Sequence, residues 1–412
     1  MPSPSTSRRA PLRDAVGATR TLFKRTFGHA PTHLIKAPAR LELLGSHAEW
    51  NDGLALTVAI DRHLCLAAAP RTDGRIELVS SAYPQRERFW LSDLAANPEA
   101  PWTALVKAVL RELRIRGVHF GGFSAVVHSE IPPGAGLGSS GALLAATALL
   151  IRQLYPHKLT ETGATVRRLG REKLPPPTKL ERLRLARLCR QAGASSASAA
   201  GGTLDALSTL CAEQFSAMML DAQHGTVEPL PLIGEIAVVV ADTGRLSPIV
   251  EAQSAALRFH CAGAAQALGV KSLRAVEPVQ LKAARGRLSA RQGACAYHIV
   301  GEKQRVVAAE RMLHEGDLLQ FGEFLNQIHA SAREFFQNNT RETDWLVAAA
   351  RAHPACLGTR LSGPGFGGYT VNLVLWNEAA DFCARIEEEF AKATGRKLGT
   401  LRCRVVDGAR AM

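Results

Sequence analysis

The sequence predicts an α+β fold of two lobes, and three observations lead to this prediction. The chain has 412 residues, a length that suits one large unit of two lobes better than four small domains. Helical and strand patterns are mixed without the regular βαβ alternation of a parallel sheet. After residue 232 the pattern changes, because a short apolar strand is followed by long amphipathic helices. We therefore expect an N-terminal domain over residues 31–233 and a C-terminal domain over residues 234–412.

The N-terminal half mixes predicted strands and helices. Residues 1–30 are basic and have no apolar run of signal-peptide length, so we expect a disordered tail, with a transit peptide as the alternative. Residues 156–180 are polar and contain prolines, which indicates a surface insertion. The helix predicted at residues 139–154 is apolar nearly all round and should be buried. The other expected strands are residues 32–45, 54–70, 75–81 and 121–131, and the other expected helices are residues 100–117 and 180–192 and one that follows the turn at residue 201.

The C-terminal half is expected to begin with a short buried strand at residues 236–242. Residues 358–376 have the pattern of a loop followed by a strand, and residues 401–408 that of a closing strand. Amphipathic spacing predicts helices over residues 250–269, 297–316, 317–336 and 378–395.

The composition argues against a membrane protein and against a disulfide-rich secreted protein. No run of about 18 consecutive apolar residues occurs, so we expect no membrane span. The eight cysteines are scattered and none has Cys-x-x-Cys spacing, which favours buried free thiols in a reducing cytosol over a metal site or a disulfide framework. We therefore expect a cytoplasmic protein.

The chain is basic, with 50 Lys and Arg against 37 Asp and Glu and a net charge of +13. Such a chain can bind nucleic acid, an anionic surface or a phosphorylated ligand. Much of the excess lies in the tail and in residues 167–190, where no aromatic side chains interleave to form a stacking platform. We expect a solvated basic face there, and nucleic acid is the least favoured partner.

A glycine-bearing loop that leads into an apolar helix points to phosphate binding. It reads "IPPGAGLGSSGALLAATALLI" over residues 131–151. Glycines let backbone amides approach a ligand, and the unpaired amides and dipole of a helix N-terminus attract an anion. An ordinary Ser-capped helix after a glycine turn is the alternative, and no Walker loop pattern is present. The expected phosphate-binding residues are Pro133, Gly134, Ala135, Gly136, Leu137, Gly138, Ser139 and Ser140.

A second glycine cluster, "SGPGFGG" at residues 362–368, also precedes a predicted strand. Its glycines Gly363, Gly365 and Gly367 are further candidates for binding the nucleotide. A tight turn explains them as well. A single explanation for both glycine clusters is that the two loops bind one triphosphate from opposite sides, and this is the simpler hypothesis. The sequence leaves open whether the loops face each other.

Two further stretches carry charged side chains beside predicted elements. In "GGTLDALSTL", Asp205 follows two glycines, and a lone Asp there is more often a helix cap or surface acid than a catalytic group. The stretch "APARLELLGSHAEWNDG" at residues 37–53 gathers polar side chains around a turn of small residues, which suits a polyhydroxyl ligand. These side chains are Arg40, Glu42, His47, Glu49 and Asp52.

The order of these stretches resembles the GHMP small-molecule kinases, and among them the galactokinases most closely. Residues 131–151 are similar to the family's Pro-x-x-x-Gly-Leu-x-Ser-Ser loop, and residues 362–374 are similar to its third motif. Residues 37–53 are similar to the galactokinase signature Gly-Arg-Val-Asn-Leu-Ile-Gly-Glu-His-Thr-Asp-Tyr-Asn. The likeness covers roughly residues 33–412, apart from the insertion.

The resemblance implies a two-lobed GHMP kinase fold, in which the N-terminal lobe is like ribosomal protein S5 domain 2, the C-terminal lobe is ferredoxin-like, and ATP lies between them. It implies that Asp205 accepts the proton of a sugar hydroxyl and that Arg40 steadies the developing alkoxide, so both are catalytic. Ser140 would bind Mg²⁺ and Trp102 would lie beside the nucleotide. The implied sugar-binding residues are Arg40, Ser46, His47, Glu49, Gly202 and Asp205.

Four residues depart from the galactokinase pattern. Ser46 stands in place of Glu, Glu49 in place of Asp, and Ser254 in place of a sugar-contacting Tyr. A lost hydrogen bond to a charged group costs about 1.5–3 kcal/mol, so these changes leave the sugar open. Gly193 stands where the resemblance implies a Mg²⁺-binding Glu, although Mg²⁺ often keeps several waters.

We expect an ATP- and Mg²⁺-dependent kinase, acting as a monomer, that converts galactose or a related sugar to its 1-phosphate. Phosphoryl transfer needs alignment and charge neutralisation more than covalent help, and these residues would supply both. The alternatives are a GHMP kinase for another small-molecule alcohol and a catalytically weak sensor of sugar and nucleotide.

Overall fold

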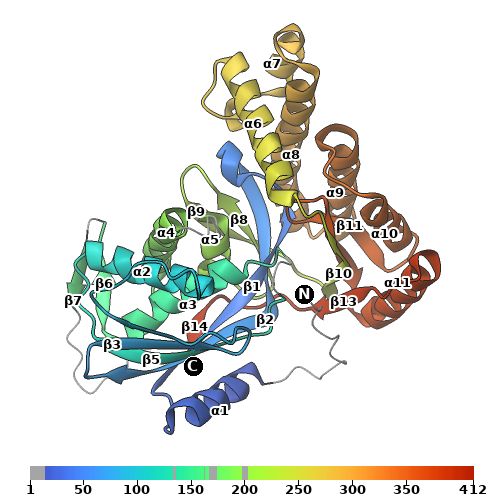
Figure 1. Ribbon diagram of the computed structural model, residues 1–412. Coiled ribbons are helices and arrows are strands. Elements are labelled where there is room, and N and C mark those ends of the chain that lie inside the picture. The colour runs from blue at the N-terminus through green and yellow to red at the C-terminus, as the bar shows by residue number, and fades with distance from the viewer. Residues whose placement is uncertain (1–13, 133–135, 162, 167–173, 197–202) are drawn as a thin grey trace.

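Figure 1 presents the computed structural model, in which the chain folds into an N-terminal lobe, a C-terminal lobe and a helical arm that projects from the second lobe. The structure describes residues 14–132, 136–161, 163–166, 174–196 and 203–412. Helices and strands are mixed in both lobes, so the predicted α+β class is confirmed.

One eight-stranded sheet forms the N-terminal lobe. Its strand order is β14-β1-β2-β5-β3-β4, with β8 paired to β2 and β9 paired to β8. β3 runs parallel to β5, and β2 is antiparallel to β1, β5 and β8. The strands are β1 (His33–Leu44), β2 (Leu54–Arg71), β3 (Arg75–Ser80), β4 (Glu87–Trp90), β5 (Gly122–Ser129), β8 (Ser216–Asp221), β9 (Thr226–Pro231) and β14 (Arg410–Ala411).

Helices cover one face of this sheet (Figure 1). They are α2 (Ala104–Ile115), α3 (Ser139–Leu154), α4 (Lys179–Ser195) and α5 (Thr203–Cys211). α3 is buried at every residue from Gly141 to Arg152, as its apolar sequence predicted, and it packs on β1 and β2. α4 begins with a capping box, in which Thr178 and Glu181 satisfy each other's backbone amides.

The opposite face of the sheet is covered by a helix that was not predicted. The expectation of a disordered tail over residues 1–30 is wrong for α1 (Ala15–Phe27), which packs on β2 and β5. Phe23 is fully buried against Ala67, Ala69 and Val126, which alternate along their strands with residues of the main core. The tail prediction also covers residues 1–13, which lie outside the described residues.

The C-terminal lobe contains a four-stranded antiparallel sheet in the order β11-β12-β10-β13. Its strands are β10 (Ile236–Leu246), β11 (Cys356–Ser362), β12 (Gly367–Leu375) and β13 (Gly399–Cys403). The loop expected at residue 358 is wrong as far as Ser362, because those residues form β11 and pair with β12. The helices beside the sheet are α9 (Leu318–Ser331), α10 (Arg341–Arg351) and α11 (Ala379–Thr394), and the arm consists of α6 (Val250–Leu268), α7 (Pro278–Ala283) and α8 (Ala290–Glu315).

The passage between the lobes lies close to the predicted boundary, since β9 ends at Pro231 and β10 begins at Ile236. One late element departs from the prediction: β14 pairs with β1, so residues 410–411 belong to the N-terminal sheet. The expected insertion contains a hairpin of β6 (His157–Leu159) and β7 (Ala164–Val166). Residues 162 and 167–173 of the insertion lie outside the described residues.

All eight cysteines are free thiols and seven of them are buried, as the scattered spacing predicted. Within the part of the chain that the structure describes, no helix has both the length and the apolar character needed to cross a lipid bilayer.

Candidate active site

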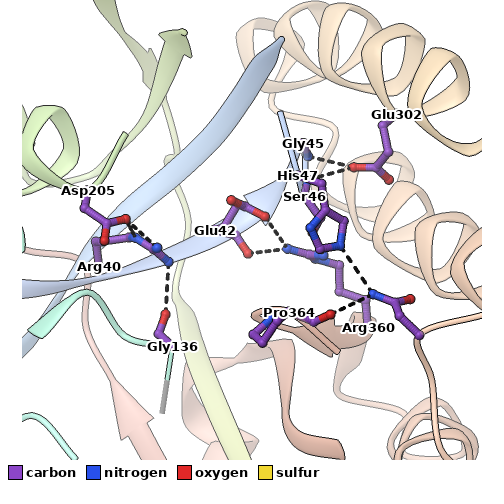
Figure 2. Close-up of polar contacts among 11 residues, drawn as sticks. Arg40, Glu42, Gly45, Ser46, His47, Gly136, Asp205, Glu302, Arg360 and Pro364 are labelled. Carbon is purple, nitrogen blue, oxygen red and sulfur yellow. Dashed lines mark hydrogen bonds and ion pairs between the residues drawn. The ribbon is translucent and has the colours of Figure 1, made fainter. Parts of the chain in front are cut away.

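Arg40 and Asp205, which lie far apart in the sequence, form an ion pair at the base of the site (Figure 2). Arg40 lies on β1, and Asp205 lies in the first turn of α5, where the helix dipole favours a carboxylate. Nε of Arg40 donates to Oδ1 of Asp205 at 2.6 Å, and Nη2 contacts the same oxygen. Burial opposes the charge of Arg40, but Asp205, Glu42 and Glu49 outweigh it and raise the pKa of the guanidinium. Arg40 therefore stays positively charged beside the carboxylate.

The first glycine loop lies against the same arginine. Nη1 of Arg40 donates to the carbonyl of Gly136 at 3.0 Å, and the backbone amide of Arg40 donates to the carbonyl of Leu137 at 3.0 Å. Gly138 has a φ of 73°, and a Cβ added there would lie 2.7 Å from Cγ of Arg40. A larger residue at position 138 would therefore push Arg40 away from Asp205. The preceding residues Pro133, Gly134 and Ala135 lie outside the described residues.

The start of α3 leaves two serine hydroxyls available. Gly138, in the left-handed conformation, occupies the N-cap position, and no side chain caps the helix. The Ser-capped helix considered as an alternative is therefore not formed. Ser139 and Ser140 are partly exposed, and no hydrogen bond joins their hydroxyls to another described residue. These hydroxyls and the first amides of α3 can bind an anion.

The two glycine loops meet. A Cβ added to Gly136 would lie 3.4 Å from Cα of Gly363, so these glycines of the two lobes face each other closely. Packing within the protein explains the other two candidate glycines of the second cluster, Gly365 and Gly367. A Cβ on Gly365 would lie 2.4 Å from the carbonyl oxygen of Asn338, and one on Gly367 would lie 2.7 Å from that of Arg245. Of the three candidate glycines in this cluster, Gly363 is thus the one that faces the first glycine loop.

The turn after β1 is held from the C-terminal lobe. Oε2 of Glu302, on α8, accepts hydrogen bonds from the amides of Gly45 and Ser46 at 2.9 and 3.0 Å. Burial raises the pKa of the Glu302 carboxyl to about 7, although Arg360 and Arg305 oppose the rise. Figure 2 shows this carboxylate beside Gly45 and Ser46.

Arg360 on β11 holds the same turn from the other side. Its side chain is fully buried and donates through Nη1 to Oγ of Ser46. Nη2 donates to the carbonyl oxygen of Glu42 at 2.7 Å and lies 3.4 Å from Oε1 of the same residue. Sequence reasoning missed both Arg360 and Glu302. A single charge inside an otherwise uncharged strand was the signal available for Arg360.

His47 lies in a compact aromatic cluster. Its ring centroid is 4.8 Å from those of Trp50 and Phe336, and its φ is 65°. Burial, with the nearby charges of Arg360 and Arg258, lowers the pKa of His47 to about 3. The ring is therefore neutral at physiological pH, and its Nε2 lies 3.3 Å from Nδ2 of Asn338.

The other predicted residues are spread around this centre. Glu49 begins a short 3₁₀ helix, Glu49–Asn51, and its charge contributes to the raised pKa of Arg40. Trp102 lies within a 3₁₀ turn, and its ring is parallel to that of Tyr83 at 6.1 Å between centroids. Nε1 of Trp102 is buried and has no hydrogen-bond partner among the described residues. Gly202 lies outside the described residues.

Two departures noted in the sequence can be placed. Gly193 is buried in the last turn of α4, and its carbonyl accepts a bond from Ser196. Ser254 is buried on α6, which packs against the 3₁₀ helix at residues 49–51, and its hydroxyl has no partner among the described residues. An unpaired hydroxyl at this position can bind a ligand oxygen.

The described residues contain no cluster of three or more His, Cys, Asp or Glu side chains that could hold a metal by themselves.

A Cβ added to Gly141 would lie 2.6 Å from Cβ of Asp205, so glycine at 141 brings the first turn of α3 against Asp205. Ser140, which precedes Gly141 in the same turn, therefore lies near Asp205 in space. It offers one hydroxyl to a cation that draws its remaining ligands from phosphate and water, which is the usual habit of Mg²⁺.

A cavity of ≈940 Å³ lies elsewhere, between the start of α4, β8 and β14. None of the predicted site residues lines it. The predicted site is instead defined by Arg40, Asp205, the two glycine loops and the turn after β1.

The chain is similar to known galactokinases over most of its length. The galactokinase galactose-binding signature matches residues 21–70, and the GHMP kinases N terminal domain matches residues 104–175. A galactokinase of Roseiflexus sp. (strain RS-1) is 31% identical over 397 residues, covering 95% of this chain and 96% of that protein. A galactokinase of Homo sapiens is 31% identical over 391 residues, covering 93% of this chain and 94% of that protein.

Solved structures are similar over nearly the whole chain. A Lactococcus lactis galactokinase complexed with galactose matches with a TM-score of 0.84 at 22% identity, covering 96% of this chain and 99% of the other. A mevalonate kinase matches with a TM-score of 0.60 at 16% identity, covering 91% of this chain and 99% of the other. At these identities the solved structures establish the fold, which is the two-lobed fold of the GHMP kinases.

Proposed function

The chain belongs to the galactokinase family of the GHMP kinases and is an ATP-dependent sugar kinase, and we propose that its acceptor is the anomeric hydroxyl of galactose or a related sugar. The products are the sugar 1-phosphate and ADP. The four ordered motifs and the similarity over more than nine-tenths of the chain support this proposal.

The contacts of one side chain give this proposal its strongest support. A single guanidinium, that of Arg40, contacts both the Asp205 carboxylate and the carbonyl of Gly136 in the first glycine loop. The group proposed to take a proton and the loop proposed to hold the phosphates thus lie on either side of one cation. Phosphoryl transfer requires the two bound substrates to be held close together, and this shared contact supports such an arrangement.

We propose that Asp205 accepts the proton of the sugar hydroxyl as the new oxygen–phosphorus bond forms. The hydroxyl is a poor nucleophile until that proton is drawn away. Arg40 stabilises negative charge on the sugar oxygen, and its raised pKa keeps it charged throughout. The amides and hydroxyls of residues 136–140, with Gly363 opposite them, hold the phosphates. Residues 133–135 and Trp102 complete the proposed nucleotide site.

Mg²⁺ is proposed as the accompanying ion, with the Ser140 hydroxyl as a ligand. When bound, it would neutralise phosphate charge. The glycine at 193 offers no carboxylate for it, so the ion would depend more on water and phosphate than it does where a Glu is present.

The sugar-binding set is proposed to be Arg40, Ser46, His47, Glu49, Gly202 and Asp205. The hydroxyl of Ser46 is buried and is bonded to Arg360. A sugar that relied on a Glu carboxylate at position 46 would therefore lose that contact. This supports testing relatives of galactose as well as galactose itself.

The test is a coupled assay of ADP release with ATP, Mg²⁺ and a panel of free hexoses and pentoses. We expect sugar-dependent ADP release, greatest with galactose or a close relative, and a sugar 1-phosphate as the product. In the matched variant Asp205→Asn, which keeps the shape of the side chain, turnover should fall about 10²–10⁴-fold because the general base is removed. Undiminished turnover in this variant would refute the assignment of Asp205.

The absence of a carboxylate at position 193 also favours a second candidate, a catalytically weak sensor of sugar and nucleotide. Calorimetry separates the two. Binding of sugar and of a nonhydrolysable ATP analogue, without ADP release on any sugar of the panel, would favour the sensor over the kinase.

We also propose that the protein acts in the cytoplasm, which its eight free thiols support. A monomer is proposed as the working unit, and light scattering coupled to size exclusion tests it.

A further inference from the structure

Asn338 connects three segments of the site. It follows α9 and the short helix Ala332–Phe336, and it is 1% exposed. Its Nδ2 lies 3.2 Å from the carbonyl oxygen of Pro364 in the second glycine loop and 3.3 Å from Nε2 of His47. Its own carbonyl accepts a bond from the amide of Phe366. The glycine at 365 permits this approach, because a Cβ there would lie 2.5 Å from Nδ2 of Asn338.

The carbonyl of Pro364 fixes which way the Asn338 amide points. A carbonyl oxygen only accepts hydrogen bonds, so the atom facing it must be the NH₂ group. The same NH₂ group has a second hydrogen and lies 3.3 Å from Nε2 of His47, and because an amide NH₂ only donates, Nε2 is the acceptor of this contact. A ring nitrogen that accepts a hydrogen bond carries a lone pair and no proton.

The contact with Asn338 determines which ring nitrogen of His47 carries the proton. The ring is neutral, since burial and the positive charges of Arg360 and Arg258 hold its pKa near 3. A neutral imidazole has a single N–H group, so with Nε2 accepting, the proton lies on Nδ1. Trp50 and Phe336 contact the ring and keep it from turning. Among the described residues, no hydrogen bond to Nδ1 is formed by protein groups.

We propose that Asn338 is a positioning residue that holds His47 in the Nδ1–H tautomer, so that His47 donates a hydrogen bond to an oxygen of the acceptor sugar. This inference rests on the proposed sugar kinase function, and it adds a residue outside the four motifs. It also connects the sugar site to the second glycine loop, since one NH₂ group serves both. Loss of the amide should therefore weaken sugar binding more than it slows the chemical step.

The tautomer is measured directly by two-bond ¹H–¹⁵N spectra of protein labelled in its histidines, with His47 assigned from the signal missing in His47→Gln. We expect Nδ1 to be protonated and Nε2 unprotonated in the full-length protein. In Asn338→Asp, the carboxylate accepts a bond and donates none, so Nε2 should become protonated and the pKa of His47 should rise. Unchanged His47 nitrogen signals in Asn338→Asp would overturn the proposal.

Steady-state kinetics with the sugar supply a second test of the role of Asn338. In Asn338→Ala we expect the KM for the sugar to rise about tenfold, the effect of one lost hydrogen bond, with kcat changed much less. The matched control is Asn339→Ala, whose amide donates to Asp344 instead at 2.7 Å. This control should keep the tautomer and the KM. An equal rise in KM in Asn339→Ala would indicate general loosening and would overturn the specific role of Asn338.

Failure of this inference can be distinguished from failure of the proposed function. The tautomer is read without substrate, so a protein silent toward every sugar still reports whether Asn338 sets His47. Conversely, an active kinase whose His47 proton lies on Nε2 retains the proposed function and rejects the inference.

Discussion

Arg360 is the residue whose environment departs most from what its chemistry prefers. A fully buried guanidinium normally requires compensating partners, and here they are Ser46, the carbonyl of Glu42 and the Glu42 carboxylate. All of them belong to β1 and the turn that follows it, in the other lobe. The residue therefore stabilises the fold and shapes the site through the same contacts.

In Arg360→Met, we expect the free energy of unfolding to fall by about 3–5 kcal/mol, because buried acceptors lose their charged partner. Urea unfolding followed by far-UV circular dichroism measures it. The control is Arg385→Met on α11, whose pair with Glu389 is exposed and should contribute about 0.5 kcal/mol or less. A similar small loss in both variants would contradict the role given to Arg360.

Glu302 makes stability depend on pH in an unusual direction. Its pKa is raised from 4.5 to about 7 in the folded protein by burial, against the pull of Arg360 and Arg305. Between these two values the folded state binds a proton that the unfolded state has lost. The free energy of unfolding contributed by this group therefore falls as pH rises from about 4.5 to about 7.

We expect Glu302→Gln to flatten that dependence and to be more stable than the parent above pH 7. A Gln oxygen can still accept from the amides of Gly45 and Ser46, which both bind one oxygen of Glu302. The difference at pH 8 should be on the order of 3 kcal/mol, as given by the size of the pKa shift. Parallel stability curves for the two proteins between pH 4.5 and 8 would contradict this expectation.

At the scale of elements, helices and strands with a long hydrophobic pattern could be predicted from the sequence, and those with a short pattern could not. The apolar run of α3 and the alternation of β1, β2 and β5 specify their own structure, because each buries its pattern along its whole length. The hairpin of β8 and β9 was missed, since both strands are short and mix polar with apolar residues. α1 was missed because its basic residues dominate a narrow apolar face.

The importance of α1 can be measured. Phe23 is fully buried against β2 and β5, so Phe23→Ala should lower the free energy of unfolding by about 3–5 kcal/mol. Thr21→Ala, at an exposed position of the same helix, should change it by less than about 0.5 kcal/mol. Equal thermal midpoints for parent and Phe23→Ala would mean that α1 does not pack on the sheet in solution.

The site was predictable in part. Motif order placed Arg40, Asp205 and the glycine loops, and the structure brings Arg40, Asp205, Gly136 and Gly363 together. Arg360, Glu302 and Asn338 could not be found in this way. Each of them has a partner in the other lobe, 314 positions away for Arg360 and Ser46, so these contacts exist only after the lobes are packed.

At the scale of the whole molecule, the last strand of the sequence pairs with the first. β14 pairs with β1, the amide of Met412 donates to the carbonyl of Leu34, and Ala409 is buried beneath the N-terminal lobe. The N-terminal sheet is therefore completed by residues that follow the entire C-terminal lobe in sequence.

Deleting residues 409–412 should lower the free energy of unfolding by about 2–4 kcal/mol, through several lost backbone hydrogen bonds. The double variant Arg410→Ala and Met412→Ala is the matched control. It removes exposed side chains and keeps the backbone pairing, so its stability should stay close to that of the parent. Equal urea midpoints for the deletion and the control would show that the pairing of β14 adds nothing.

The place of β14 also has a consequence for biosynthesis. Until its two residues leave the ribosome, the outer edge of β1 has no strand to pair with, although most of the lobe has already been translated. Such an open edge invites pairing with other nascent chains. Chaperone capture during translation should therefore concentrate on the segment around β1 and end once β14 has paired with it.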